Sequence, residues 1–283
     1  MNIENYGYYI INTLVYLAIA VGMKHLLNIK AANYFNADEQ MSDGNLALAI
    51  RRGGVQFGLA IAMIGVMGGQ SSADFMTDLG MTVFYGLVAA GFMIFSLLVT
   101  DKLVLPSVNN TKEIGKGNVA LSCVEFGTLV MTGILAYASI TGDQGGILSS
   151  LAYFVAGQIM LVLLVLAYEK IFQAKLNPAK KVAEGNVAAG IYLGGKIIAY
   201  GLILQSAITG GDIPETFSSA AIELISTAVA GMILLYIFEY LIDVVIVTSS
   251  TVKDILEKNQ VVQSIQLSIS KISVALILGM AIL

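Results

Sequence analysis

A Gly-Asn pair followed by a long hydrophobic run recurs along this chain, and this repeat constrains the fold more than any other feature. The pair stands at three places and in altered form at a fourth: Gly44-Asn45, Gly117-Asn118, Gly185-Asn186 and Lys258-Asn259. Asn45 and Asn186 are 141 residues apart, and the same distance separates Asn118 from Asn259. A fixed period of this kind indicates a fold built from repeated units. We therefore predict four copies of one unit, arranged as two halves of two copies each.

The hydrophobic runs identify the class of protein. Hydrophobic residues make up 57% of the 283 residues, charged residues make up 12%, and the mean hydropathy is +0.82. A soluble domain of this size carries about twice this charged fraction. The runs continue over about 20 residues without alternating with polar residues, which favours spanning helices and argues against a transmembrane β-barrel. The predicted fold class is therefore all-α, a polytopic membrane protein.

Eight runs are long enough to cross a bilayer core of about 30 Å, since a helix rises about 1.5 Å per residue. We predict helices over residues 8–27, 46–68, 79–100, 119–140, 148–170, 187–209, 218–247 and 260–283. Each repeat is then a pair of helices, and the Asn opens the second helix of the pair. The halves comprise residues 1–141 and 142–283, and we predict that they superpose with the same membrane orientation. The first six residues carry Glu4 and no basic residue, so we expect a retained helix and not a cleaved signal peptide.

The basic residues predict the orientation of these helices. All 15 Lys and Arg lie at the end of the first helix of a repeat, between its two helices, or inside the second helix after its Asn. The segments that join one repeat to the next, around Asp74, Asp143 and Asp212, contain none. Loops that carry Lys and Arg remain in the cytoplasm. This distribution places the four Lys-bearing loops in the cytoplasm and both ends of the chain on the opposite side.

The Asn at the start of each second helix has a structural interpretation. Asn is favoured as a helix N-cap, and the preceding Gly tolerates the turn. The predicted caps are Asn45, Asn118, Asn186 and Asn259. Four matching Asn side chains near a symmetry axis could also bind a ligand, and one role does not exclude the other. Glycines four residues apart within the second helices, such as Gly190 and Gly194, let helix backbones approach closely in lipid.

Several ionisable residues fall within the predicted spans, where charge is expensive and usually faces protein or water. They form a candidate intramembrane site: Arg51, Arg52, Glu125, Lys196, Lys271, Glu239 and Asp243. The arginines, Glu239 and Asp243 are near enough to the cytoplasmic face to reach the lipid headgroups instead. Lys271 lies deeper and on a polar helix face, so it meets either an ion-pair partner or a transport pathway.

Arg52 and Glu125 occupy matching positions, seven residues after Asn45 and Asn118. If the second helices of the first half pack around a local twofold axis, equal depth places these two side chains together. A buried pair of this kind is tolerable, whereas either charge alone is costly to bury. We therefore predict an ion pair between Arg52 and Glu125. The second half carries the uncharged residues Leu193 and Gln266 at the same positions.

The chemistry of soluble enzymes is not evident in the sequence. His25 is the single histidine and belongs to no HExxH motif, and no GxxxxGK[ST] or Gly-x-Ser-x-Gly motif is present. Cys123 is the single cysteine, so it cannot form an internal disulfide and has no cysteine partner for a metal site. We expect no enzymatic activity, no cofactor, no metal site and no nucleic-acid partner.

The repeated pattern resembles a family of bacterial inner-membrane proteins known as domain of unknown function 350. The pattern is an acidic residue, a Gly-Asn pair, small apolar residues and one or two glycines: Glu39 to Gly44-Asn45 to Gly53-Gly54, Glu113 to Gly117-Asn118 to Gly127, and Glu184-Gly185-Asn186 to Gly194-Gly195. A single domain of that family has two such repeats, so the resemblance implies two tandem domains in the inner membrane. It brings no established activity. Family members tend to occur beside phage-shock-type peripheral membrane proteins and ligases resembling those of polyamine–glutathione metabolism, which implies a link to envelope stress.

We expect a channel or transporter as the first function, and a membrane scaffold is the alternative from a different class. The repeats, the deep charges and the polar helix face suggest a channel or transporter. The basic cytoplasmic loops suggest a non-transporting scaffold that docks a cytoplasmic peripheral membrane protein. A second copy of the chain is a further candidate partner besides that protein and the lipid bilayer. A continuous water-accessible path would favour transport, and a dry, side-chain-filled interior around Lys271 would favour the scaffold.

Overall fold

The computed structural model of the chain describes residues 3–68, 74–105, 108–141, 146–171, 176–210, 217–245 and 250–282. Asp143 and Asp212, which the charge pattern placed in outer segments, lie outside these ranges. The described residues form helices joined by short turns and contain no strand.

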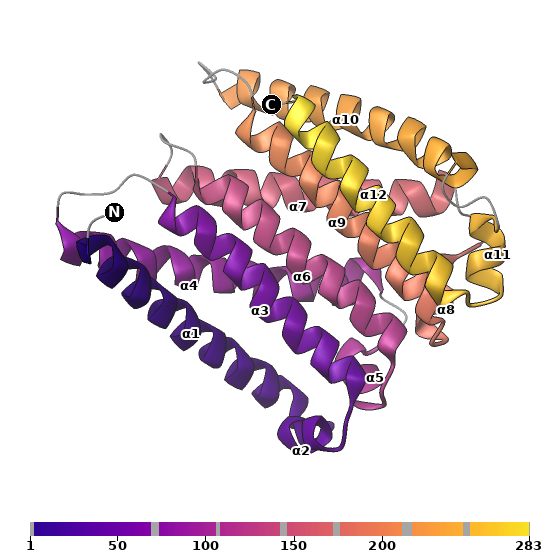
Figure 1. Ribbon diagram of the computed structural model, residues 1–283, viewed down its shortest axis with the longest axis horizontal. Coiled ribbons are helices and arrows are strands. Elements are labelled where there is room, and N and C mark those ends of the chain that lie inside the picture. Colours follow the sequence, from indigo (N-terminus) through magenta and orange to yellow (C-terminus); the bar gives the residue numbers. More distant parts are fainter. Residues whose placement is uncertain are drawn as a thin grey trace.

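Eight long helices account for most of the chain. They are α1 Ile3–Ala31, α3 Leu46–Met67, α4 Phe75–Val99, α6 Val119–Ile140, α7 Gly146–Ile171, α9 Val187–Thr209, α10 Phe217–Val245 and α12 Val261–Ile282 (Figure 1). All eight are long and apolar enough to cross a membrane. The predicted all-α fold with eight spanning helices is therefore confirmed, and the observed ends lie within about five residues of the predicted ones.

Each repeat also contains a short helix that the hydrophobic pattern did not predict. These helices are α2 Ala37–Ser42, α5 Asn110–Gly115, α8 Pro178–Ala183 and α11 Val252–Glu257. A short π-helical segment, η1 (Thr100–Val104), continues α4. The short helices lie at one end of the molecule, and the start of α1 and the end of α12 lie towards the other end (Figure 1). A repeat is thus a long helix, a short helix and a second long helix.

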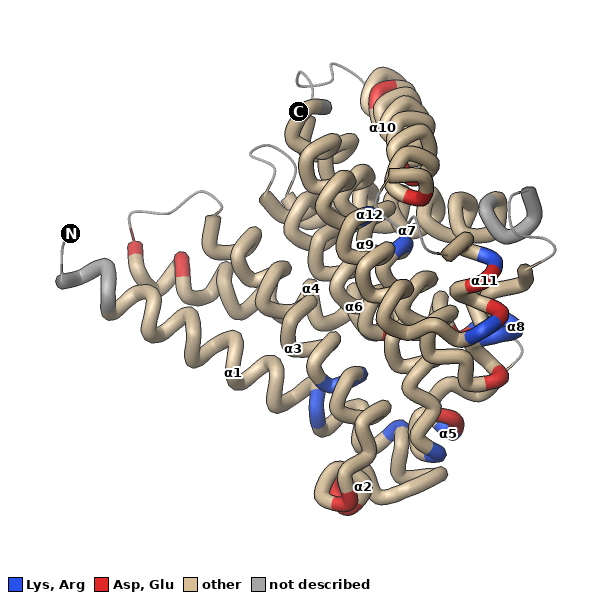
Figure 2. The backbone as a smooth tube through the Cα atoms, turned by 45° about the vertical axis from the view of Figure 1, so that its right-hand side comes forward, with Lys and Arg blue, Asp and Glu red and all other residues tan. Residues whose placement is uncertain are grey.

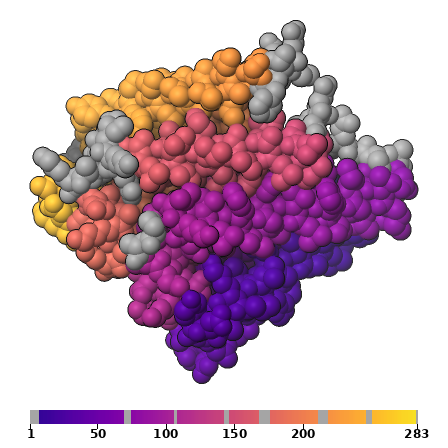
Figure 3. All heavy atoms as spheres, turned by 180° about the vertical axis from the view of Figure 1, so that it is seen from behind, coloured from indigo at the N-terminus to yellow at the C-terminus, as the bar shows by residue number. Residues whose placement is uncertain are grey.

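The second long helices form a single row at the centre of the molecule. α3 packs on α6, α6 on α9 and α9 on α12. Three first helices cover one side of this row, because α4 packs against α3 and α6, α7 against α6 and α9, and α10 against α9 and α12. Figure 3 shows α4, α7 and α10 across this side. The contact between α6 and α9 joins the two halves, so the row continues from one half into the other.

Small residues on two faces of the inner helices, α6 and α9, bring the row together. On α6, Gly133 lies against Gly58 of α3, while Gly127 lies against Gly194 of α9. A Cβ atom added to Gly133 would overlap the carbonyl oxygen of Gly58, and one added to Gly127 would overlap that of Gly194. These contacts require glycine. Close approach through small residues is the usual way in which helices associate in lipid, where burial of apolar surface gives little driving force.

The predicted Asn caps are present in the first three repeats. The Oδ1 atoms of Asn45, Asn118 and Asn186 each accept a hydrogen bond from the backbone N–H three residues later, over 2.8–3.0 Å. The glycine before each Asn has a φ angle of 84–87°, in the left-handed region that favours glycine. The Gly-Asn pair therefore ends the short helix and begins the long one.

The fourth repeat is shifted by one residue from the predicted alignment. Asn259 has a φ angle of 50° and takes the place of the glycine. Gln260 takes the place of the cap, because its backbone N–H bonds to Ile255 O five residues earlier, as Asn186 N–H bonds to Lys181 O. The prediction that Asn259 is the fourth cap is wrong by one residue. Asn tolerates the left-handed conformation better than other non-glycine residues, so it can stand in for the missing glycine.

Candidate functional site

Two clusters of charged residues are buried within the membrane-spanning part of the fold. The first lies between α3 and α6, where Arg51 Nε is 2.8 Å from Glu125 Oε2. The exposed fractions of these side chains are 2% and 0%. Arg51 is six residues after the cap position Asn45, which places it about 9 Å into the helix from the short-helix end. A charge pair so enclosed holds α3 and α6 in register, because either charge without the other would be costly to bury.

Glu125 pairs with Arg51 and not with Arg52, contrary to the sequence-based prediction. Matching positions meet only around a twofold axis, whereas each helix in this row uses one face for the preceding helix and another for the following one. Arg52 therefore points towards α1 and α2, where it donates to Asn28 Oδ1 over 2.9 Å and to Asp38 Oδ1 over 2.7 Å. The hydrogen bond from Arg52, together with one from Lys24, lowers the pKa of Asp38 to about 2.

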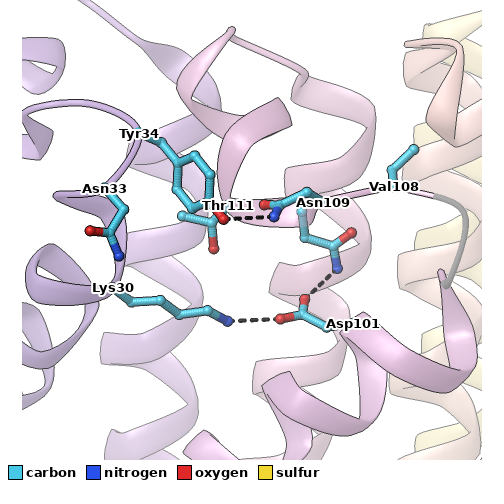
Figure 4. Close-up of a pocket in the computed structure, with 8 residues that line it drawn as sticks. Lys30, Asn33, Tyr34, Asp101, Val108, Asn109 and Thr111 are labelled. Carbon is cyan, nitrogen blue, oxygen red and sulfur yellow. Dashed lines mark hydrogen bonds and ion pairs between the residues drawn. The ribbon is translucent and has the colours of Figure 1, made fainter.

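A polar pocket of about 370 Å³ lies at the short-helix end, close to the first cluster. Lys30 Nζ is 2.7 Å from Asp101 Oδ2, and Asn110 Nδ2 donates to Asp101 Oδ1 over 2.7 Å (Figure 4). Asn109 donates to the hydroxyl of Tyr34 across the pocket over 2.9 Å. Asn110 belongs to α5, which packs against α6, the helix that carries Glu125. The sequence pattern does not predict this pocket, because Lys30 and Tyr34 come from the first repeat, whereas Asp101, Asn109 and Asn110 come from the second.

The second cluster joins α9, α10 and α12 near the middle of the membrane. Lys196 Nζ of α9 is 2.9 Å from Glu239 Oε2 of α10, and Lys271 Nζ of α12 is 3.8 Å from Glu239 Oε1. Lys196 and Lys271 are ten and eleven residues after their cap positions, which corresponds to about 15 Å of helix. Asp243 lies one helical turn after Glu239 on α10. The structure thus brings together four of the predicted intramembrane residues.

Tyrosine rings enclose the two lysines of this cluster. The ring centroid of Tyr236 is 5.1 Å from Lys196 Nζ, and that of Tyr192 is 4.3 Å from Lys271 Nζ. The hydroxyls of Tyr200 and Tyr236 are 2.9 Å apart. Aromatic faces attract cations, and the attraction is stronger where water is excluded. These tyrosines were not predicted from the sequence. Their spacing along a spanning helix is the same as that of aromatic residues that simply fill the core.

Burial separates these clusters from the charges at the short-helix end. Lys196 and Lys271 are each 1% exposed, so water does not reach their ammonium groups in this conformation. Most other Lys and Arg gather towards α2, α5, α8 and α11 (Figure 2). A further buried polar contact joins Gln158 of α7 to Ser96 of α4 over 2.8 Å. The cap residues do not converge on one point, since the row spaces them from one helix to the next.

Comparisons with known proteins identify the family. The family described as Domain of Unknown Function (DUF350) matches residues 1–140 and again residues 144–282. The chain belongs to the DUF350 family. Two copies of the DUF350 domain therefore stand in tandem, as the resemblance implied, and each copy contains two of the four repeats. A UPF0719 transmembrane protein of Aquifex aeolicus (strain VF5) is 26% identical over 245 residues, which cover 84% of this chain and 87% of that protein. No solved structure matches the chain.

Proposed function

We propose that this DUF350 protein is a membrane platform that docks a cytoplasmic protein on the surface formed by α2, α5, α8 and α11, hereafter the short-helix surface. The observation that carries this proposal is the closed interior around Lys271. Its ammonium group is covered by Tyr192 and Glu239, and its side chain is 1% exposed. By the criterion drawn from the sequence, an interior filled with side chains favours a scaffold over a transport path.

The short-helix surface is accessible and carries charges of both signs. The exposed fractions of the side chains of Lys180, Lys253 and Lys258 are 71%, 67% and 65%. Each lies within 4 Å of an acidic side chain four residues away on the sequence. Exposed pairs of this kind contribute little to stability because water and salt screen them, so a partner's charged groups can replace them at little cost. The surface therefore suits a polar, charged partner.

The orientation of the chain belongs to the same proposal. The distribution of Lys and Arg supports placing the short-helix surface in the cytoplasm and both ends of the chain in the periplasm of a bacterial inner membrane. The family resemblance suggests that the docked partner is a peripheral membrane protein linked to envelope stress. Such a partner would meet the short-helix surface at the level of the lipid headgroups.

Purification in mild detergent, with identification of co-purifying proteins, tests the platform. The informative variant is Lys180→Glu with Lys181→Glu, and the matched control is Lys180→Arg with Lys181→Arg, which keeps the charge. We expect a protein that co-purifies in stoichiometric amount with the unmodified chain and the arginine control, and that is lost from the glutamate variant. The proposal would be contradicted if no partner co-purified in stoichiometric amount. It would also be contradicted if the glutamate variant retained as much of the partner as the unmodified chain.

The second cluster favours an alternative, proton or ion transport. Ionisable residues at mid-membrane depth are a recognised mark of transport pathways, and Glu239 is a carboxylate placed beside two lysines, with Asp243 one helical turn away on α10. In this alternative the closed interior is an occluded state. Reconstituted vesicles with a pH-sensitive dye test it, with the flux expressed per folded, reconstituted molecule. A flux through this cluster would be abolished by Glu239→Gln combined with Lys271→Met, which removes one charge of each sign from the cluster. The matched control is Glu223→Gln, a carboxylate towards the other end of the same helix.

A further inference from the structure

The row of second helices has an edge at α3 where a helix-binding face is left open. In the rest of the row, the residues eight and fifteen positions after the cap contact the preceding helix, as Gly194 does with Gly127 and Gly201 with Met131. The equivalent residues on α3 are Gly53 and Ala60. Among the described residues no helix of the row precedes α3, and a Cβ atom added to Gly53 would meet nothing within 4 Å. The face of α3 that carries Gly53 and Ala60 is therefore equivalent to the faces through which α6, α9 and α12 pack on the preceding helix.

A polar side chain stands on the same face at the middle of the membrane. Gln56 is eleven residues after Asn45, about 16 Å into the 22-residue helix α3. Its side chain is exposed, and no described residue forms a hydrogen bond with its side-chain amide. The hydroxyl of Tyr16 in α1 donates to the backbone oxygen of Gln56 over 3.2 Å and does not reach that amide. The equivalent residues in the rest of the row, Leu129, Ile197 and Lys271, are all buried in protein. An amide left open to hydrocarbon is costly, since lipid offers no hydrogen-bond partner.

We infer that a second copy of the chain covers this face, with α3 packed on α3 around a twofold axis along the membrane normal. Both copies insert with the same orientation because they share one distribution of basic residues. The two Gln56 side chains then lie at the same depth. Each amide offers both donors and an acceptor, so the pair can form reciprocal hydrogen bonds. Gly53 and Ala60 allow the two backbones to approach closely above and below this pair.

The opposite edge of the row does not offer the complementary surface that a head-to-tail assembly would need. The positions two and nine after the cap, which face the following helix, hold Ala120 and Gly127 in α6. In α12 they hold Val262 and Ile269, whose side chains are 76% and 59% exposed. Bulky side chains at both positions prevent the close approach seen inside the row. The α12 edge thus suits lipid, and the open face of α3 suits a copy of itself.

Oxidative cross-linking in native membranes tests this interface in a Cys123→Ser background, which removes the single native cysteine. Gly53→Cys introduces a thiol on the inferred axis without disturbing the monomer, because its Cβ meets no neighbour. Ile269→Cys is the matched control, exposed at similar depth on the opposite edge of the row. We expect a covalent dimer from Gly53→Cys alone and none from Ile269→Cys alone. A dimer that forms only when both variants are mixed would show a head-to-tail contact and overturn the twofold interface, as would the absence of any dimer.

Gln56→Leu gives a second readout that does not depend on cross-linking. Native mass spectrometry or fluorescence energy transfer between labelled copies measures the dissociation constant of the dimer. Loss of the paired amides is expected to weaken association on the order of threefold to thirtyfold. Ser273→Leu on the exposed face of α12 is the control and should leave the dissociation constant unchanged. An unchanged dissociation constant for Gln56→Leu, or a protein that is monomeric at all concentrations, would contradict the inference.

Discussion

Asn186 donates a hydrogen bond from Nδ2 to the backbone carbonyl oxygen of Leu256, over 2.7 Å. Leu256 belongs to the short helix of the next repeat, four residues before the cap position Gln260. The equivalent bonds in the other repeats run from Asn45 to Ile114 and from Asn118 to Val182. Each Asn thus closes the start of its own long helix through Oδ1 and ties that helix to the following repeat through Nδ2. The short-helix surface is held together by this series of bonds.

Substitutions at Asn186 separate these two roles. Asn186→Ser keeps a cap acceptor but loses the bond to Leu256, whereas Asn186→Ala loses both. A lost cap and a lost hydrogen bond each contribute about 1 kcal/mol, so we expect the free energy of unfolding to fall by about 1 kcal/mol for Ser and about 2 kcal/mol for Ala. Unfolding in mixed micelles measures the difference. Equal losses for the two variants would mean that the bond to the next repeat contributes nothing.

The buried pair of Arg51 and Glu125 predicts a non-additive pair of substitutions. Removal of one partner leaves an uncompensated buried charge, so Arg51→Met or Glu125→Leu alone should lower the free energy of unfolding by about 3–5 kcal/mol. The double variant should recover most of this loss. Arg52→Met is the control, because Arg52 bonds to Asn28 and Asp38 and not to Glu125. If Arg52→Met and not Arg51→Met is rescued by Glu125→Leu, the observed pairing is wrong.

Glu239 compensates two buried lysines, so its removal should be more disruptive than that of an ordinary membrane carboxylate. Glu239→Gln leaves Lys196 and Lys271 without their shared partner, and we expect a large loss of folded protein in membranes. Adding Lys271→Met removes one of the two cations and should restore part of the yield. Fluorescence size-exclusion chromatography measures the folded fraction. Full folding of Glu239→Gln alone would show that the cluster tolerates two unpaired cations.

The ionisation of Asp38 makes the stability of the folded state depend on pH in the acidic range. Arg52 and Lys24 lower its pKa from 3.8 to about 2. A carboxylate with a lowered pKa stabilises the folded state above its unfolded pKa, and this contribution disappears as the pH falls through the folded value. The stability difference between the unmodified chain and Asp38→Asn should therefore be constant above about pH 5 and shrink between about pH 5 and pH 1. Thermal unfolding in detergent across this range measures it, and a difference that is undiminished at about pH 2 would contradict the assignment.

The spanning helices were predictable because each one must by itself be long enough and apolar enough to cross the membrane. Length and hydropathy set where α6 and α9 begin and end, and the Gly-Asn pair marks their first residues. The short helices are different, since six residues such as Pro178–Ala183 are too few to show a hydrophobic period. The shift of the fourth cap from Asn259 to Gln260 also escaped prediction. Asn can take either the glycine's or the cap's place, and only the backbone conformation distinguishes the two.

The charged residues were predictable as a set but not as pairs. Their depth follows from counting residues along a helix, and it correctly placed Arg51, Arg52 and Glu125 at similar levels. The direction in which a side chain points around the helix depends on which neighbours the helix has. A row gives each helix two different neighbours on two different faces, so Arg51 and not Arg52 meets Glu125. The meeting of Lys196 and Lys271 at Glu239 likewise depends on how three separate helices pack.

Disulfide formation between α6 and α9 tests the continuous row most directly. In a Cys123→Ser background, Met131→Cys with Gly201→Cys places two thiols across the boundary between the two DUF350 domains. A Cβ atom added to Gly201 would lie 3.2 Å from Met131 Cβ, close to the distance of about 3.5–4.5 Å that a disulfide requires. Ala60→Cys with Ser273→Cys is the matched pair at the same repeat positions on α3 and α12, which would meet only if the row closed into a ring.

Peptide mapping by mass spectrometry after mild oxidation distinguishes the two arrangements. The row predicts an efficient disulfide within one chain between residues 131 and 201, and none within one chain between residues 60 and 273. A link within one chain between residues 60 and 273, or the absence of the link between 131 and 201, would contradict the continuous row.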